Sequence, residues 1–255
     1  TLNGEGLQHQ DGHSLILANT IPNCLSYDPT YAYEMAVIVH EGMRRMYENQ
    51  EGVFYYITAM NENYSHPAMP EGSEEGIIKG LYKLKAGGKH KVKAQLIGSG
   101  TILREVEAAA EMLEKDWNVS ANVWSATSVN ELVREGMDVD RYNRLHPTAE
   151  KKRSYISECM DDQDGVVVAS TDYMRLYAEQ LRPWIKQRYV VLGTDGFGRS
   201  DTRERLRSFF EVDRYHVVVA TLSALADEGT IKYDVVAKAI KQYKIDADAT
   251  NPVKV

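Results

Sequence analysis

The sequence predicts an α/β protein with an open, mostly parallel sheet and helices on both faces, preceded by the end of a second α/β domain. After residue 91, short β-branched stretches alternate with amphipathic helical patterns, which indicates right-handed β-α-β crossovers. The stretch 165–170 (GVVVAS) is wholly apolar, as in strands buried on both faces. A Pro- and Gly-rich stretch at 65–76 interrupts all periodicity. We therefore expect two domains, at 1–70 and 71–255.

Composition limits the classes of function. The 255 residues are 43% hydrophobic and carry a net charge of -7, with Lys and Arg mixed among the acids, so nucleic acid is not an expected partner. The sequence has no apolar run of membrane-spanning length and no signal segment. Cys24 and Cys159 are far apart, which favours a reducing, cytoplasmic location. Because the sequence begins with Thr1 and not with an initiator Met, we expect a fragment of a longer polypeptide.

In the amino-terminal part, the segment 21–28 reads as a strand that Asp28-Pro29 ends, and a helix is expected over 29–48. Its apolar positions recur at spacings of three and four and predict one packing face, with His40 partly buried beside it; they are Ala32, Met35, Ala36, Val39, Met43 and Met46. The run 53–60 (VFYYITAM) predicts a buried strand. The polar residues 61–64 that follow fit either a site at a strand end or a turn.

The carboxyl-terminal part is expected to begin with a short helix or turn through Leu84 and a basic loop at 87–91. Strands are then expected at 92–97, 119–126, 165–170 and 189–192, and helices at 101–116, 129–144, 173–184, about 200–210, 214–227 and 233–243. Helix caps are assigned to Thr127-Ser128, to Asp172, and to Ser200 or Asp201, with a helix break near Gly136.

The main concentration of chemistry lies in the loop 6–14, where His9, Asp11 and His13 stand between Gly6 and Gly12. A metal site is disfavoured because the rest of the sequence offers no cluster to complete it. Acid-base or substrate-orienting histidines and a structural loop whose imidazoles bind backbone carbonyls are equally compatible with the spacing.

A second conspicuous stretch is the glycine-punctuated turn 193–201 (GTDGFGRSD) between a strand and a helix. Its position resembles that of a phosphate-binding turn. However, the spacing matches neither a P-loop nor GxGxxG, and Asp195 would repel an anion. A tight structural turn is the favoured interpretation.

Three separated motifs then resemble one family. The loop 7–14 (LQHQDGHS), the stretch 64–72 (YSHPAMPEG) and the turn 193–201 resemble the thiamine diphosphate-dependent decarboxylating component of bacterial, homodimeric pyruvate dehydrogenase. The turn and the Gln10-Asp11-Gly12 loop also resemble transketolases, in which a Glu stands where this chain has Gln10. The resemblance covers the whole chain and implies the carboxyl-terminal part of a longer enzyme, with residues up to about Pro70 finishing the central pyrimidine-binding domain.

The resemblance implies that His9 lies in the active centre and helps to position the pyruvate carboxylate or to stabilise the intermediate; Glu5 is a weaker candidate, near the active-site channel. No role is transferred to Asp11 or His13. The family's diphosphate and magnesium site and its activating glutamate would precede Thr1, so no cofactor-binding or metal-ligating residue is assigned to this chain. The chain alone is expected to bind no cofactor tightly and to be inactive.

For the whole enzyme, the resemblance implies an oxidoreductase of a multienzyme complex that makes acetyl-CoA from the product of glycolysis. Its cofactors would be thiamine diphosphate and magnesium. Its expected partners are pyruvate, a second copy of the chain, and the dihydrolipoyl acetyltransferase core, whose lipoyl group is reductively acetylated. Two alternatives remain open, namely a fragment of a transketolase or 2-oxoglutarate dehydrogenase, and a dimerisation and docking module without catalysis.

Overall fold

The computed structural model describes residues 1–4 and 6–255, so the expectation for Glu5 lies outside the described residues. A five-stranded sheet with the order β3-β5-β4-β6-β7 forms its centre. The strands are β3 (Tyr82–Lys85), β4 (Val92–Gly98), β5 (Val119–Ser125), β6 (Val166–Ser170) and β7 (Tyr189–Leu192). All neighbours pair in parallel except β3 and β5. The predicted open, mostly parallel α/β fold is confirmed.

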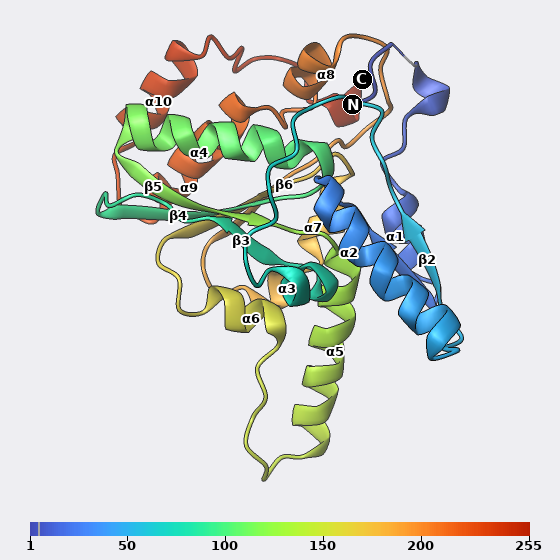
Figure 1. Ribbon diagram of the computed structural model, residues 1–255. Helices are drawn as coiled ribbons and strands as arrows, with labels where there is room; N and C mark the ends of the chain where they lie inside the picture. Colours follow the sequence, from blue (N-terminus) through green and yellow to red (C-terminus); the bar gives the residue numbers. More distant parts are fainter. Residues whose placement is uncertain (5) are drawn as a thin grey trace.

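Helices cover both faces of this sheet (Figure 1). One face carries α4 (Leu103–Trp117), α9 (Arg214–Asp227) and α10 (Tyr233–Gln242), and the other carries α5 (Val129–Leu145), α6 (Tyr155–Met160) and α7 (Arg175–Glu179). Successive strand residues point to opposite faces. In β4, Leu96 therefore packs under α4 and α9, whereas Ile97 packs against α5. The strands read as continuous apolar runs because both faces are buried.

The amino-terminal part forms a second, two-stranded sheet in which β1 (Cys24–Tyr27) and β2 (Phe54–Ile57) pair in parallel. Around it lie α1 (Ser14–Asn19) and α2 (Ala32–Met43). Helix α2 continues as a π-helix over Arg44–Glu48. Its small core joins Leu25, Tyr27 and Ile38 to Ile77 of α3 (Glu74–Lys79) and Tyr82 of β3. The two sheets are therefore packed through a shared junction.

Burial in α2 differs from the prediction. Val39 and Met43 of the predicted packing face are 42% and 57% exposed, and His40 is exposed rather than partly buried. The buried side instead contains Glu34, Ile38 and Gly42. Glu34 is tolerated there because its Oε2 accepts the N–H of Tyr31 at 2.9 Å and its Oε1 accepts the Tyr82 hydroxyl at 2.7 Å.

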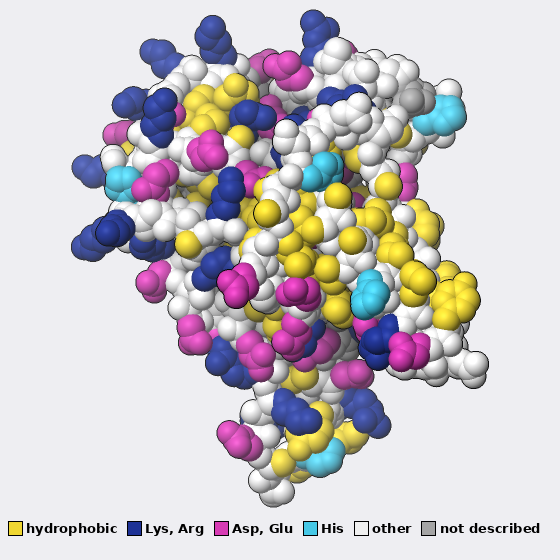
Figure 2. All heavy atoms as spheres, in the orientation of Figure 1, with side chains coloured by type: hydrophobic (Ala, Val, Ile, Leu, Met, Phe, Trp, Pro, Cys, Tyr) yellow, Lys and Arg dark blue, Asp and Glu magenta, His cyan; other side chains and the backbone are white. Residues whose placement is uncertain are grey.

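Strand β2 also differs, since Phe54 and Tyr56 are 42% and 38% exposed although a buried strand was expected. Apolar side chains gather over the region of α2 on the face of the molecule that Figure 2 draws. Phe54 and Tyr56 point to the other side of the sheet, because Tyr55 between them packs against Gly42 of α2. An apolar pattern identifies a face that is able to be buried. Among the described residues, β1 is buried along its whole length, whereas β2 and the outer side of α2 are only partly covered.

Other differences are local. Strand β3 was not expected because its four residues are too short to show a clear period of two, and α6 was not expected either. Helix α5 shows no break at Gly136. The glycine instead allows close packing against Trp184, because an added Cβ would lie 2.6 Å from the indole. Ser128 does cap α5, with the Glu131 N–H donating to its Oγ at 3.1 Å.

Two caps were placed wrongly. The expected helix over 173–184 is the shorter α7 followed by a 3-10 turn over Arg182–Trp184, and Asp172 does not cap it. Helix α8 (Arg203–Phe209) is capped by Thr202, because the turn before it continues past Ser200 and Asp201. Further 3-10 turns lie at Leu7–His9, Gly100–Ile102 and Pro252–Lys254. Across the described residues, helix length and apolarity together fall short of what a membrane crossing needs.

Candidate functional site

The two motifs that the sequence analysis considered separately lie against each other. The Arg199 N–H donates to Gln10 Oε1 at 2.7 Å, and Gln10 Nε2 donates to the Arg199 carbonyl. The Met174 N–H, just before α7, donates to the Gly12 carbonyl at 3.0 Å. The loop 6–14 is thus attached to the carboxyl-terminal sheet through the turn 193–201 and the segment after β6.

Asp11 has a structural role in this loop. Its Oδ1 accepts the N–H groups of His13 and Ser14, both at 3.0 Å, and the Ser14 hydroxyl donates to its Oδ2. These contacts satisfy backbone donors at the start of α1, as a helix cap does. Asp11 therefore orients the first turn of α1 rather than an imidazole.

The two histidines face different cavities. His9 is exposed and lines a cavity of about 300 Å³ together with residues 56–60, Asp172 and Tyr173. His13 lines a neighbouring cavity of about 280 Å³ beside Thr194 and residues 196–198. The His9 cavity thus lies at the carboxyl ends of β2 and β6. Carboxyl ends of parallel strands are where open α/β sheets bind ligands.

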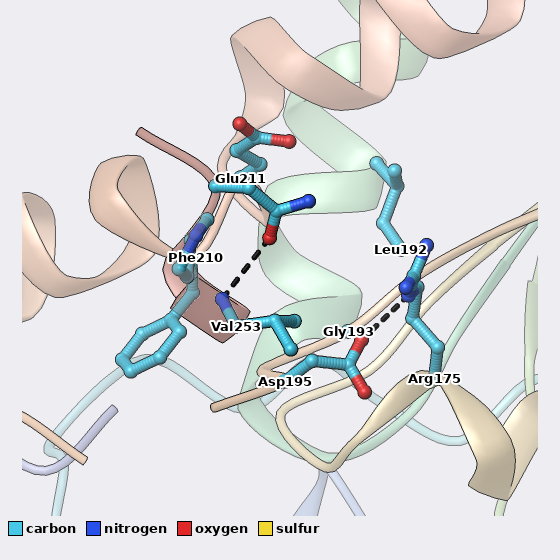
Figure 3. Close-up of a pocket in the computed structure, with 9 residues that line it drawn as sticks. Arg175, Leu192, Gly193, Asp195, Phe210, Glu211 and Val253 are labelled. Atoms are coloured by element: carbon cyan, nitrogen blue, oxygen red, sulfur yellow. Dashed lines mark hydrogen bonds and ion pairs between the residues drawn. The ribbon is translucent and has the colours of Figure 1, made fainter. Parts of the chain in front are cut away.

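The start of the turn 193–201 lies beside a small cavity that Arg175, Asp195 and Val253 help to line (Figure 3). Arg175 Nε donates to Asp195 Oδ2 at 2.5 Å. Gly196 has φ +99°, and an added Cβ there would lie 2.6 Å from the Pro252 carbonyl oxygen. The favoured interpretation, a tight structural turn, agrees with this packing, because Asp195 is paired with Arg175 and Gly196 lies against the backbone of Pro252.

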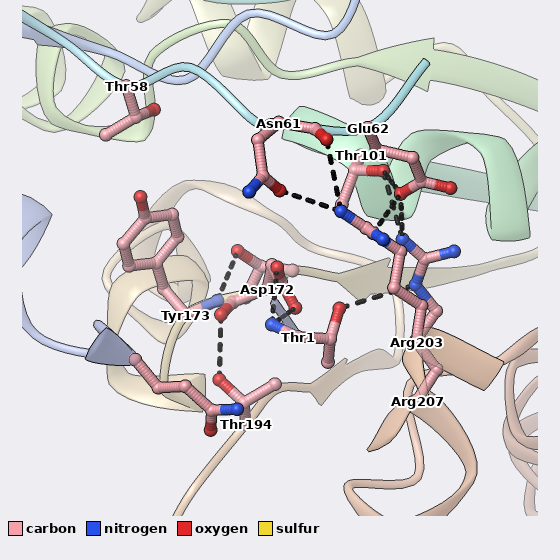
Figure 4. Close-up of polar contacts among 12 residues, drawn as sticks. Thr1, Thr58, Asn61, Glu62, Thr101, Asp172, Tyr173, Thr194, Arg203 and Arg207 are labelled. Atoms are coloured by element: carbon pink, nitrogen blue, oxygen red, sulfur yellow. Dashed lines mark hydrogen bonds and ion pairs between the residues drawn. The ribbon is translucent and has the colours of Figure 1, made fainter. Parts of the chain in front are cut away.

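The polar residues after β2 belong to an ion-pair network with α8 and α4 (Figure 4). Arg104 donates to Glu62 Oε1 at 2.8 Å, Arg203 donates to Asn61 Oδ1 at 2.7 Å, and the buried Arg207 also donates to Glu62. Although burial would raise the pKa of Glu62, Arg207 and Arg104 outweigh it and lower this pKa to about 2. Neither interpretation of 61–64 anticipated these partners, which are distant in sequence.

Asp28 is an acid that the sequence analysis treated only as the end of a strand. It is buried at the carboxyl end of β1, where the Thr58 hydroxyl donates to its Oδ1 at 2.7 Å. Its main chain bonds across the junction, to the Thr127 carbonyl at 2.8 Å and from the Gly100 N–H at 3.1 Å. Burial raises its pKa to about 7, against hydrogen bonds from Thr58 and Ser99. The sequence feature that could have drawn attention to Asp28 is the Asp-Pro pair directly after an apolar strand.

No trio of His, Cys, Asp or Glu with the geometry to hold a metal ion is found among residues 1–4 and 6–255. The arginines of the network described above are paired with Glu62 and Asn61. The described part of the site therefore offers an imidazole, hydroxyls, backbone groups and the carboxylates of Asp11 and Asp172 around a cavity at a sheet edge.

Comparisons with known proteins place this fold. A transketolase from Leishmania mexicana superposes with a TM-score of 0.62 at 16% identity, covering 87% of this chain and 28% of that one. A split-gene transketolase, described as an inactive beta4 tetramer, gives a TM-score of 0.54 at 20% identity, over 86% of this chain and 63% of that one. The chain thus has a transketolase-like α/β fold.

Sequence relatives are more specific. Residues 1–67 match the model of the pyruvate dehydrogenase E1 component middle domain, and residues 80–213 match that of the transketolase-like carboxyl-terminal domain. The pyruvate dehydrogenase E1 components of Pseudomonas aeruginosa and Escherichia coli strain K12 are 61% and 59% identical over 99% of this chain. The chain belongs to the pyruvate dehydrogenase E1 component family. It spans 29% and 28% of the lengths of these two relatives.

Proposed function

We propose that this chain is part of an enzyme that decarboxylates pyruvate with thiamine diphosphate and reductively acetylates a lipoyl group. The observation that carries the proposal is the position of His9, inside a family-specific loop and on a cavity at the carboxyl ends of β2 and β6. Because the chain spans less than a third of its relatives, the activity is proposed for the whole polypeptide.

The cofactor assignment follows the same division. Thiamine diphosphate and magnesium are proposed to bind mainly to parts of the longer polypeptide outside these 255 residues, as the family resemblance implies. When bound, the cofactor supplies the carbon nucleophile and the electron sink for decarboxylation. The donor set around His9 fits the reacting end of such a cofactor, where a small carboxylate has to be held.

His9 is proposed to hold the substrate. A protonated or hydrogen-bonding imidazole binds a carboxylate through charge-assisted contacts. Exposure of the side chain toward the cavity leaves it free to do so. Glu5 remains a weaker proposed contributor near the channel, on the family resemblance alone. No catalytic role is proposed for Asp11, which caps α1, or for His13.

The test uses the full-length enzyme that carries this sequence. His9→Ala should lower kcat/KM for pyruvate on the order of 100-fold or more, the range of a lost acid-base or orienting group. His13→Ala is the matched control, since it removes a second exposed histidine from the same loop and should have a much smaller effect. Equal rates for His9→Ala and the wild type would remove His9 from the active centre. Assays with 2-oxoglutarate and with a ketose phosphate would separate the two related thiamine enzymes.

The proposed partners are a second copy of the chain and a dihydrolipoyl acetyltransferase core. The exposed apolar residues of α2 and β2 support a covering subunit or domain, as solvent-exposed apolar patches often mark interfaces. This observation also favours the second candidate function, a dimerisation and docking module. Native mass spectrometry of the 255-residue chain tests this second candidate, since a stable dimer of the chain by itself would favour the module.

Two further proposals concern the chain by itself. We place the division between its domains at residue 70, supported by the separate sheet of β1 and β2 and by the irregular segment before α3. We also expect the isolated chain neither to decarboxylate pyruvate nor to bind thiamine diphosphate tightly. Calorimetric detection of micromolar binding to this chain would contradict that expectation.

A further inference from the structure

We propose that Gln10 is a positioning residue: its side-chain amide fixes the His9 loop on the turn 193–201, and so sets where the imidazole lies in the cavity. The inference rests on the role proposed for His9 and adds a residue to that site. It starts from one observation, the two-way bonding between the Gln10 amide and the main chain of Arg199.

The Gln10 amide uses both of its functions on one residue. Its Oε1 accepts the Arg199 N–H at 2.7 Å, and its Nε2 donates to the Arg199 carbonyl. Of the polar side chains of this length, a neutral amide combines a donor and an acceptor in one plane without charge. An ionised carboxylate would keep the first bond but lose the second, and would place its charge against a carbonyl oxygen.

The turn is shaped to admit this side chain. An added Cβ at Gly198 would lie 2.8 Å from Gln10 Cβ and closer still to Gln10 Oε1. Real Cβ atoms are not found at such separations from their neighbours, so the glycine permits the amide to reach the backbone. The glycine at position 198 in this turn is therefore explained in part by the close approach of the Gln10 side chain from the loop 6–14.

The contact matters for His9 because the loop is weakly held by its own bonds. Within the 3-10 turn, the N–H groups of His9 and Gln10 donate over 3.3 and 3.4 Å, which is beyond the usual range of such bonds. Firmer contacts begin at Gln10 and continue at Asp11 and Gly12. The amide is thus the first firm attachment after the imidazole, one residue away from it.

The experiment compares Gln10→Glu with Gln8→Glu in the full-length enzyme. The control makes the same chemical change two residues earlier, at an exposed side chain. Hydrogen exchange followed by mass spectrometry should show Gln10→Glu lowering the protection of peptides that cover 6–14 and 194–201 at neutral pH. Protection should return in acid, where a protonated carboxyl can donate again. Gln8→Glu should leave both peptides unchanged.

Gly198→Ala should also disrupt the contact between Gln10 and Arg199, but without a change of charge. It should reduce the protection of both peptides, and acid should not restore it. Unchanged protection in both Gln10→Glu and Gly198→Ala would overturn the proposal. A loss of protection confined to one of the two peptides would also overturn it, because the Gln10 amide joins the loop 6–14 to the turn 193–201.

Activity gives the positioning readout. Gln10→Glu should lower kcat/KM for pyruvate roughly 10- to 100-fold at neutral pH, since small displacements of an orienting group are costly, and should recover toward acid pH; Gln8→Glu should match the wild type. If Gln10→Glu loosens both loops but retains full activity while His9→Ala is inactive, positioning by Gln10 is wrong and the proposed function stands. If the wild-type enzyme does not turn over pyruvate, the proposed function fails. The hydrogen-exchange experiment still decides whether Gln10 attaches the loop 6–14 to the turn 193–201.

Discussion

The two sheets of this chain have similar apolar strands but different burial. In the five-stranded sheet, helices from the same chain cover both faces, and Leu96 of β4 is fully buried. In the two-stranded sheet, Tyr56 of β2 is 38% exposed, and Met43 of α2 is 57% exposed. Parallel strands normally have both faces covered. The five-stranded sheet is thus covered by helices of its own chain, whereas the two-stranded sheet is buried along β1 but leaves apolar side chains of β2 exposed.

The junction between the sheets contains two acids in contrasting surroundings. Glu62 is met by Arg104, Arg203 and Arg207, and its pKa falls to about 2. Asp28 is buried with hydroxyl and backbone neighbours, and its pKa rises to about 7. Whether an acid is ionised here depends on the nearest partners supplied by the other part of the chain. The following four experiments, in order of expected effect, test this comparison in the 255-residue chain.

The largest effect is expected at Asp28. Its pKa is raised from 3.8 to about 7 on folding, so the folded state holds the proton more tightly. The stabilisation is complete below the unfolded pKa and is lost as the pH rises through about 7. Asp28→Asn has no proton to lose, so its free energy of unfolding relative to the wild type should increase on the order of 4 kcal/mol from pH 4 to pH 8. Urea denaturation across this range measures it.

The control for Asp28 is Asp138→Asn, because Asp138 is exposed on α5 and its amide should leave the pH dependence as in the wild type. Parallel stability curves for the wild type and Asp28→Asn would mean that Asp28 is not a buried, titrating group of the junction.

The next effect is expected in the complete sheet. Leu96→Ala removes a fully buried side chain from the core under α4 and α9, and should lower the free energy of unfolding by about 3 kcal/mol. The matched variant is Leu17→Ala on α1, where the side chain is 63% exposed, and it should change stability by less than about 0.5 kcal/mol. Similar losses in both variants would refute the contrast in burial.

A smaller effect is expected for Glu62→Gln, which removes the charge that Arg207 and Arg104 contact. The loss should be about 2 kcal/mol near neutral pH, as for hydrogen bonds to charged groups. Because the pKa of Glu62 is lowered on folding, its stabilisation is present above the unfolded value and disappears as the pH falls toward 2. The wild type and the variant should therefore converge in acid, which is opposite to the behaviour of Asp28. A difference that is constant with pH would contradict the assignment.

The smallest effect is expected for Met43→Ser on the exposed face of α2. In this chain it should change the free energy of unfolding by less than about 0.5 kcal/mol, since the side chain already meets solvent. In the full-length enzyme, the same substitution should weaken dimerisation or lower the melting temperature if this face is covered there. Absence of any effect in the longer protein would show that the face stays exposed.

The sequence predicted those features that depend on neighbouring residues. Strands such as β5 and β6 and helices such as α9 were placed within one or two residues, because their period and apolarity are local properties. The cap at Ser128 was predicted for the same reason. Strand β3 failed because four residues show little period, and the packing face of α2 failed because burial depends on what lies across from it.

The site was predicted only in part. The loop 6–14 and the turn 193–201 were both identified from their composition, but nothing in either pattern indicates that they touch. Gln10 and Arg199 are 189 positions apart, and their contact follows from the whole fold. Asp11 stood out because it lies between two histidines in the sequence, yet the backbone donors at the start of α1 bind its Oδ1. The role of His9 remains a prediction from family resemblance.

Strand β3 has a consequence for solubility. It is the antiparallel edge of the five-stranded sheet, and an open edge offers unpaired backbone groups to strands of other molecules. Lys83 and Lys85 are exposed on this short strand, and lysines at an edge disfavour the addition of a further strand. Replacing both with threonine would leave the core unchanged but remove this protection, so the chain would aggregate while still folded.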